Sequence, residues 1–454
     1  MNYMHYKTSL LLFLIISLLY PIQSFSGGDG TPGNPYNISN CVELQNMSSN
    51  LNAHYQLEES IDCSGINFIP VGNCTANCNG ANRNPFFGTF NGNNFTIDNL
   101  NITNTTSPNS AWGLFGSAES GTIENLIIKD AYINVPSNNY IGALIGYSDV
   151  VNVNNVNVSA TVIGDRRVGG LIGEAYIVLV ENSYNNVVNI SGTEFVGGLI
   201  GYSRFVDTIN TSIYGNVEGS TFGGTGGGFG YGAYLIVDNA YFSGTVTGRD
   251  EVGGLLGKSG ATTNEIDNSA SSGSVSGRNN VGGLVGESNQ LRVSNSWSNS
   301  SVTGDINVGG LVGYNINYGD IRNSYSTGNV TVLVSEGGGL VGLNDLDGEI
   351  SNSYYLNTTG NPDIAIGFDV EAQSVTAITD ENFFFNYSNA LYNGNWNNNT
   401  IWTFSGSSYP TLNYLIEEIE ENPITSPVSE STSSLFPMMS IPITIGILMA
   451  YLII

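Results

Sequence analysis

The sequence predicts an all-β protein built as a right-handed parallel β-helix, a solenoid of about nine coils with roughly 28 residues in each. Two sequence markers repeat in step at that interval, and no stretch of a repeat has the apolar period of a helix. Charged residues make up only 11% of the chain, so Asn, Ser, Thr and Gly must supply most of its polarity. Short apolar runs between such residues are typical of strands joined by tight turns.

The first marker is a hexad of the form Val-Gly-Gly-Leu-Ile-Gly, which recurs nine times at a spacing of 27 to 30 residues. Close copies begin at Val168, Val196, Val252, Val281 and Val308, and looser copies begin at Ala111, Ile141, Thr225 and Gly337. A period this steady over nine units indicates one repeated structural unit.

The second marker is an Asn followed by a small residue and usually an aromatic residue. It begins at Asn182, Asn239, Asn268, Asn295, Asn323 and Asn352, in step with the hexads. Short alternating segments such as Gly244–Gly248 lie between the markers, so each coil should hold about three strands of three to five residues, with turns of Gly, Asn and Ser.

A parallel β-helix fits this period better than other repeated β architectures. A propeller blade needs about 40–50 residues, and sandwich strands do not repeat so evenly. In a solenoid, equivalent residues stack: Val, Leu and Ile point inward, Asn side chains bond to the Asn of the next coil, and Gly allows sharp corners. Nine coils would form a rod roughly 43 Å long.

The hexad resembles the GLUG repeat of bacterial and protist surface proteins, among them streptococcal immunoglobulin A peptidases, and the resemblance covers about residues 111–342. The segments Tyr55–Leu57 and Phe87–Asn93 resemble the coils that open such repeats, and Tyr409–Leu412 resembles their closing segment. This resemblance implies an adhesin-like solenoid. The peptidases also have a zinc protease domain with an HExxH helix, which this chain lacks because its histidines are His5 and His54 alone.

The two ends of the chain indicate secretion and a membrane anchor. Residues 1–26 read as a signal peptide, with Lys7, the apolar run Leu10–Leu19 and cleavage after Ser26. The last 20 residues, 435–454, are apolar and follow a Ser/Thr-rich spacer. Because no Lys or Arg follows Arg322, this tail fits a GPI-attachment signal better than a spanning helix with basic cytoplasmic residues.

Lipid attachment is expected within the spacer, and the alternative of a single transmembrane helix stays open. The candidate attachment residues are Ser429, Ser431, Ser433 and Ser434. Either anchor places the protein on the extracellular face of the plasma membrane, with the membrane as one partner and a glycan or protein on the cell surface as the expected ligand.

Five regions follow the signal peptide in the predicted organisation. Residues 27–110 form an N-terminal cap and opening coils, 111–354 the repeats, 355–416 a C-terminal cap, 417–434 an acidic Ser/Thr/Pro stalk, and 435–454 the anchor signal. The exposed edges at both ends of a solenoid need covers. The apolar pattern of Cys41–Asn50 therefore predicts a short capping helix.

All four cysteines, Cys41, Cys63, Cys74 and Cys78, lie in one stretch near the N-terminus. In a secreted chain they predict two disulfide bonds. Three connectivities are open, and the short loop favours Cys74–Cys78 together with Cys41–Cys63. A zinc site that uses His54 is the rival interpretation, although the oxidising compartment argues against it.

Fourteen Asn-x-Ser/Thr sequons are candidates for N-glycosylation in the secretory pathway. They begin at Asn37, Asn46, Asn73, Asn94, Asn101, Asn104, Asn157, Asn189, Asn210, Asn299, Asn329, Asn357, Asn386 and Asn398.

Charge and motif content argue against several ligand classes. The mature chain loses Lys7 and no acid, which leaves 38 acidic and 10 basic residues, and this sign repels nucleic acid. The phosphate-loop-like run Gly253–Ser259 is one residue short and repeats a column of the hexad, so no nucleotide is expected. Asp345–Glu349 alternates like a calcium loop but lacks its other ligands. We predict no metal, cofactor or catalytic residues.

An aromatic column, made of Tyr184, Tyr241, Trp297, Tyr325 and Tyr354, could stack sugars, but packing at a corner of the solenoid is the preferred interpretation. The predicted function is therefore structural, adhesive or recognition-based. The alternative is a carbohydrate-active β-helix enzyme, which would need paired carboxylates about 5–10 Å apart in a cleft.

Overall fold

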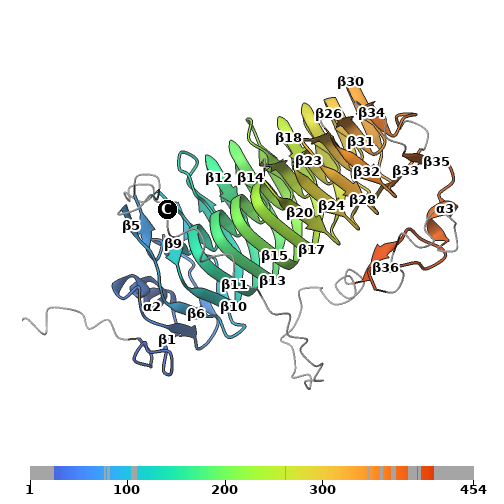
Figure 1. Cartoon of the computed structure of the whole chain (residues 1–454). Helices are drawn as coiled ribbons and strands as arrows, with labels where there is room; N and C mark the ends of the chain where they lie inside the picture. The colour runs from blue at the N-terminus through green and yellow to red at the C-terminus, as the bar shows by residue number, and fades with distance from the viewer. Residues whose placement is uncertain are drawn as a thin grey trace, which may run out of the picture. The chain divides into compact units, whose positions relative to one another are not determined.

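The computed structural model describes residues 25–75, 78, 82–103, 110–260, 262–345, 347–357, 361–369, 375–386, 396 and 400–413. They form a parallel β-solenoid of about nine turns whose coils stack in chain order (Figure 1). The predicted fold class is thus confirmed. The predicted signal peptide up to residue 24, the stalk, the lipid-attachment serines, the apolar tail and the sequons Asn104 and Asn398 lie outside the described residues.

The opening coils contain β1 (Tyr36–Ile38), β2 (Tyr55–Leu57), β3 (Ile61–Asp62), β6 (Thr89–Asn91), β7 (Thr96–Asp98), β8 (Asn101–Ile102) and β9 (Phe115–Glu119). The long strands that follow are β10 (Thr122–Asn134), β11 (Ile145–Ile163), β13 (Ile172–Gly192), β15 (Ile200–Gly219) and β17 (Phe229–Thr247). Short strands at the hexads alternate with them: β12 (Arg166–Gly169), β14 (Glu194–Gly197), β16 (Thr225–Gly226), β18 (Asp250–Gly253) and β22 (Asn279–Gly282).

The later coils divide into shorter strands. These are β19 (Leu256–Ser259), β20 (Asn264–Asp267), β21 (Ala270–Ser276), β23 (Val285–Asn289), β24 (Leu291–Ser294), β25 (Trp297–Ser298), β26 (Ser301–Gly309), β27 (Val312–Ile316), β28 (Asp320–Arg322), β29 (Tyr325–Ser326), β30 (Val330–Gly338), β31 (Val341–Asn344), β32 (Glu349–Ser351) and β33 (Tyr354–Leu356). Each coil therefore has three segments: a first segment at the hexad, a second after it, and a third after the Asn marker.

The prediction of three short strands in every coil is wrong for the coils from β11 to β17. Strand β13 runs unbroken from Ile172 to Gly192 and bends at Ile177 and Asn182, whose backbones are left-handed, with φ of 52° and 49°. One left-handed residue turns the chain while the bonds to the next coil resume in register on both sides. The strand therefore continues around a corner without a separate turn.

The predicted Asn ladder is confirmed at the corner between the second and third segments. Asn182, Asn210 and Asn239 occupy this corner in three consecutive coils, with φ between 49° and 56°. The Nδ2 of Asn210 donates to Oδ1 of Asn182 at 3.0 Å, and the Nδ2 of Asn239 donates to Oδ1 of Asn210 at 3.0 Å. Asparagine suits this place because it tolerates a left-handed backbone better than most residues.

Buried serines explain the second position of the Asn marker. The Ser296 hydroxyl donates to the Ser294 carbonyl at 2.7 Å and accepts the Ser269 N–H of the preceding coil at 3.1 Å. Ser324 repeats both bonds one coil later, to Arg322 and from Ser296. The hydroxyl thereby satisfies backbone groups that the corner leaves without a strand partner.

The hexad glycines are needed for close approach, which corrects the expectation that they form the corners. Gly254 has no left-handed backbone, but a Cβ built there would lie 2.0 Å from the Gly283 carbonyl oxygen of the next coil. Gly170 and Gly283 meet the same obstacle one coil further along. Between these glycines, residues such as Val252 and Leu255 are fully buried and stack into the core.

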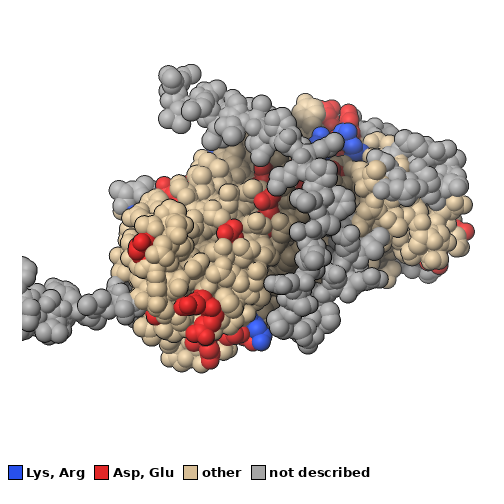
Figure 2. Space-filling view, turned by 90° about the horizontal axis from the view of Figure 1, so that it is seen from below, with Lys and Arg blue, Asp and Glu red and all other residues tan. Residues whose placement is uncertain are grey.

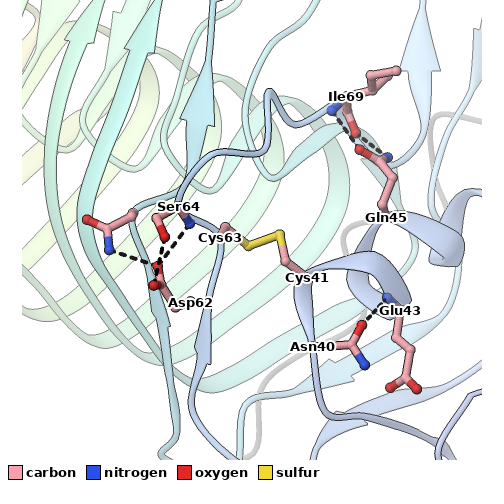
Figure 3. The surroundings of a disulfide bond; sticks show 9 residues. Asn40, Cys41, Glu43, Gln45, Asp62, Cys63, Ser64 and Ile69 are labelled. Carbon is pink, nitrogen blue, oxygen red and sulfur yellow. Dashed lines mark hydrogen bonds between the residues drawn. A yellow bond between two sulfur atoms is a disulfide. The ribbon is translucent and has the colours of Figure 1, made fainter.

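The predicted capping helix is present as α2 (Cys41–Asn46), followed by the 3-10 turn η1 (Met47–Ser49). Asn40 caps α2 by accepting the Glu43 N–H at 2.9 Å. A disulfide joins Cys41 to Cys63, and Gln45 makes two 2.8 Å bonds with the backbone of Ile69 (Figure 3). The helix is thus tied to the first coils covalently and by paired amide bonds.

The second disulfide joins Cys74 to Cys78, as preferred from the sequence. Cys74 ends the short strand β4 (Asn73–Cys74), which pairs antiparallel with β5 (Arg83–Asn84). Because both pairs of cysteines are oxidised, none can bind zinc as a thiolate. His54 instead bonds through Nδ1 to the Thr89 hydroxyl at 2.8 Å.

The solenoid extends past residue 354, where the sequence predicted that the repeat ends. Strands β34 (Ile366–Asp369) and β35 (Thr376–Ile378) pair parallel with β31 and β33. Gly367 packs against the Gly342 carbonyl as a hexad glycine does. This coil escaped detection because Asp363 and Ile364 stand where earlier coils have two glycines.

Aromatic residues after β35 cover the third segments of the last coils. This region contains the helix α3 (Asn382–Phe385) and the antiparallel pair β36 (Trp402–Thr403) and β37 (Thr411–Leu412). Phe384 of α3, Trp402 of β36 and Trp396, which lies between these elements in the chain, pack with Tyr325 at ring distances of 5.5 to 5.9 Å. Trp297, Tyr325 and Tyr354 are buried there. The preferred interpretation of that column as packing is confirmed for these three residues.

We expect Gly254→Ala to lower the free energy of unfolding by about 1–3 kcal/mol, because the new methyl must displace backbone of the next coil. Gly33→Ala is the matched control, since its Cβ would meet no atom within 4 Å. Urea unfolding followed by circular dichroism measures both. Equal stability of the two variants would contradict the close-approach explanation.

Candidate binding surface

Aromatic side chains gather on the outer side of the second segments of β11, β13, β15 and β17. We call this surface the aromatic face and define it by Tyr147, Tyr176, Tyr202, Phe205, Tyr231 and Tyr234 together with Arg167 and Arg204. Residues two apart on a strand point to the same side, and parallel pairing sets Tyr202 beside Tyr231 and Arg204 beside Tyr176. The repeat register therefore assembles one surface from four coils.

The outermost rings stand at the corner within the second segment. Phe205 and Tyr234 stack at 4.5 Å with their planes 8° apart, and Tyr176 meets Phe205 edge-on at 5.7 Å. Phe205 and Tyr234 remain 40% and 43% exposed, and Val150 in the same corner column is 47% exposed. Exposed apolar groups that adjoin one another in this way are typical of interaction sites.

The backbone conformation at this corner is unfavourable for the residues that occupy it. Val150, Ile177, Phe205 and Tyr234 all have left-handed φ, between 52° and 56°, a conformation that β-branched and bulky residues rarely adopt. The next corner in the same coils uses Asn, which tolerates that conformation. Strained positions occupied by exposed apolar residues point to a role outside folding.

A second row of the aromatic face is held by an ion pair. Glu174 lies in the column between Tyr147 and Tyr202, and its Oε2 is 3.1 Å from Nε of Arg167. Burial raises the pKa of the Glu174 carboxyl, while Arg167 and then Arg204 oppose that rise. The Arg167 guanidinium also lies over the rings of Tyr140 and Tyr202, at 4.9 and 5.3 Å.

Burial also raises the pKa of Tyr147 to about 12, and the Glu174 charge adds to that shift. Its hydroxyl therefore stays protonated at physiological pH. Arg83 lies 5.3 Å from the Tyr147 ring and pairs with Asp149 at 3.0 Å. This row is a rigid support whose charges are matched within the protein.

Arg204 differs from the other arginines. Of the eight arginines, all within the described residues, seven have a carboxylate oxygen within 4.0 Å. Arg204 instead lies over the rings of Tyr176 and Phe205, at 5.8 and 5.5 Å, and is exposed. The described surface seen from below has sparse charges, with more acidic than basic side chains (Figure 2). A guanidinium without a close carboxylate is therefore unusual on this molecule.

The sequons of the repeats avoid the aromatic face. Asn157, Asn189, Asn299 and Asn329 lie in third segments, and Asn210 lies at the ladder corner. No sequon falls in any second segment between residues 115 and 351. All twelve described sequon asparagines are exposed or partly exposed: Asn37, Asn46, Asn73, Asn94, Asn101, Asn157, Asn189, Asn210, Asn299, Asn329, Asn357 and Asn386.

The other motifs have local structural roles. Lys258, in the phosphate-loop-like run, pairs with Glu251 at 3.1 Å and Glu287 at 3.2 Å between two strands. Asp347 takes a left-handed turn in the calcium-like segment. Among the described residues, no group of three or more His, Cys, Asp or Glu could hold a metal ion.

One shallow hollow, of about 460 Å³, lies at the end of the third segments. Arg249, Arg278 and Ser/Thr side chains line it, and Glu218 is its one carboxylate. Glycoside hydrolysis by the usual route needs two carboxyl groups. This hollow therefore lacks the pair that the enzyme alternative requires.

Comparison with known proteins identifies the repeat. Residues 304–331 match the family model described as the GLUG motif. The chain carries the GLUG repeat. An immunoglobulin A1 protease of Streptococcus sanguinis is 27% identical over 231 residues, which are 48% of this chain and 12% of that protein. The chain thus matches a small part of this relative's length.

Two further similarities concern a membrane protein and a solved structure. A protein of Evansella cellulosilytica, provisionally named a Gly-rich membrane protein, is 29% identical over 225 residues, 40% of this chain and 24% of its own. A Bacteroides ovatus crystal structure, provisionally named an immunoglobulin A1 protease, aligns with a TM-score of 0.42 at 18% identity over 86% of this chain and 95% of its own.

Sequence reasoning did not find the aromatic face. Tyr202 and Phe205 recur as Tyr231 and Tyr234 after 29 residues, which is one repeat and was the available signal. The aromatic residues after the Asn marker recur in more coils and form the more evident column in the sequence. No described helix is long and apolar enough to cross a membrane.

We expect Asn299 and Asn329 to bear N-glycans and Asn210 to remain unmodified, because both ends of the Asn210 amide are bonded within the ladder. Glycopeptide mass spectrometry after secretory expression measures each site. In matched variants, Asn299→Gln should remove one glycan and Asn210→Gln none. A glycan on Asn210 would contradict the expectation that its hydrogen bonds in the ladder prevent modification.

Proposed function

We propose that this GLUG protein is a cell-surface glycoprotein, tethered to the membrane through its C-terminus, that recognises a ligand through the aromatic face. The observation that carries the proposal is the exposed stack of Phe205 and Tyr234 beside Arg204. Aromatic residues and Arg are the types most often enriched in the energetic centres of binding sites.

The arrangement of sequons supports recognition on this side of the solenoid. Glycans on Asn157, Asn189, Asn299 and Asn329 would project from the third segments. The second segments would then stay free of glycan over the whole repeat region. A protein that presents a bare aromatic face among glycosylated surfaces can bind a partner there without steric interference.

Recognition also fits the chemistry better than catalysis. Glu174 and Glu287 both have pKa values raised by burial, yet each carboxylate is paired with a cation, Arg167 or Lys258. Neither lies beside a second free carboxylate in a cleft. The similarity to the protease relative covers 12% of that protein, so its named activity is not carried over to this chain.

The tether is proposed from the sequence of the tail. Residues 435–454 are apolar, follow a Ser/Thr-rich spacer, and have no basic flank after Arg322. These features match a GPI signal, which would be replaced by a lipid in the endoplasmic reticulum. The solenoid would then stand outside the cell on its acidic stalk.

Treatment of intact cells with phosphatidylinositol-specific phospholipase C should release the protein, because a GPI lipid would be its one membrane attachment. Mass spectrometry of the mature protein provides a second readout that is independent of lipid remodelling. Peptides from Ile441–Ile454 should be absent. Their presence would mean a spanning helix and would refute the GPI proposal.

Replacement of Phe205 and Tyr234 by Asn should abolish ligand binding while the fold is retained, because Asn is the residue that this solenoid uses at left-handed corners. Cells that display the full chain are compared for adhesion to cells of the same organism, at equal surface display. Phe222→Asn is the control, since Phe222 is 57% exposed and lies outside the aromatic face. Undiminished adhesion by the double variant would refute the proposed recognition surface.

A further inference from the structure

We infer that the partner of the aromatic face is a protein that places a carboxylate on Arg204 and apolar side chains against Phe205 and Tyr234. This inference rests on the proposed function and specifies its ligand class. Three independent features of the face lead to it: the orientation of the rings, the lack of a close carboxylate beside Arg204 among the described residues, and the exposed apolar groups nearby.

The orientation of the rings disfavours a stacked sugar. A pyranose ring stacks on an open aromatic face, but Phe205 and Tyr234 each cover one face of the other at 4.5 Å, and Tyr202 and Tyr231 do the same at 4.8 Å with planes 11° apart. Parallel coils impose this geometry because equivalent rings lie one strand spacing apart. The face therefore presents ring edges and hydroxyls, which suit irregular contacts with side chains.

The positive charge of Arg204 favours the binding of an anionic group that belongs to a partner. This positive charge is exposed, and among the described residues no carboxylate oxygen lies within 4.0 Å of it, whereas each other arginine has one. Stacking on Tyr176 and Phe205 holds the planar guanidinium in place and lowers the entropy lost when it binds. A carboxylate accepts two parallel hydrogen bonds from such a group. Arg204 is thus prepared for an acidic side chain.

The surroundings of Arg204 favour a carboxylate within a protein rather than a free anion. Val150 lies in the same corner column as Phe205 and Tyr234, and Ile236 lies two residues after Tyr234. They are 47% and 46% exposed, so this part of the surface has exposed apolar area besides the stacked rings. An interface with a central Arg and aromatic residues surrounded by aliphatic contacts matches the composition of protein binding centres. A small hydrophilic anion would leave this apolar surface in water.

Adhesion of displaying cells to labelled cells of the same organism tests the inference. The labelled cells are untreated, shaved with trypsin, or oxidised with periodate to destroy glycans. We expect trypsin to remove binding and periodate to preserve it. Loss with periodate and survival after trypsin would overturn the inference in favour of a glycan, while the recognition function would stand if the Phe205→Asn and Tyr234→Asn double variant still fails to bind.

Substitution of the arginine tests the carboxylate separately. Arg204→Gln should weaken binding about tenfold or more, and Arg204→Lys should be intermediate because it keeps the charge without the planar fork. Added salt should weaken the natural protein more than Arg204→Gln.

The control is Arg249→Gln, because Arg249 also lies over an exposed ring, Phe222 at 4.4 Å, but is paired with Asp250. It should bind normally. If Arg204→Gln binds as well as Arg249→Gln does, the carboxylate contact is wrong. If only the Phe205→Asn and Tyr234→Asn double variant then loses adhesion, the proposal that the aromatic face is the recognition surface still stands.

Discussion

Backbone hydrogen bonds between neighbouring coils hold every residue beside its equivalent one repeat away. Val153 lies beside Val180, and Val180 lies beside Thr208. Each position must therefore hold a type of residue that can lie one strand spacing away from another residue of the same type. Amides, hydroxyls, aliphatic groups and stacked rings satisfy this requirement, whereas like charges directly opposite one another are destabilising. The low proportion of charged residues follows from this constraint, as does the alternation of Glu265, Arg292 and Asp320 in one exposed column.

Because of the same register, a residue type that is repeated at one outward position forms a continuous surface. An aromatic residue at one outward position becomes an extended aromatic face when the next coil repeats it, as Tyr231 follows Tyr202 and Tyr234 follows Phe205. The surface ends when a coil departs from the pattern. Lys258 takes the place after Tyr231 and pairs with glutamates instead of rings. A solenoid can thus limit a binding site to a few coils without any change in its backbone.

The strand edges at the two ends of the described solenoid are covered in different ways. Near the N-terminus, helix α2 is tied to the first coils by the Cys41–Cys63 disulfide and by the bonds of Gln45. Near the other end, Phe384, Trp396 and Trp402 pack on the aromatic column of the third segments. That packing covers the aromatic column, which is therefore not available to bind a ligand. The aromatic face of the second segments has no such cover among the described residues, and its rings stay partly exposed.

The sequence by itself determined the period, the parallel solenoid and the Asn ladder, because these depend on residues that recur along the chain. For the cysteines it favoured the observed pairing and left two others open. It could not determine that single left-handed residues make the corners, since Val150, Ile177 and Phe205 are not residues that predict such a backbone. The coil at Ile366–Asp369 was also hidden, because its two adjacent hexad glycines are replaced by Asp363 and Ile364 while its strand pairing persists. Only the tertiary structure decided that Arg204 lies on Tyr176 and Phe205 rather than beside a carboxylate. The contact with Tyr176 joins residues 28 positions apart, and its energy depends on which side of the sheet each side chain takes once the corners have set the register.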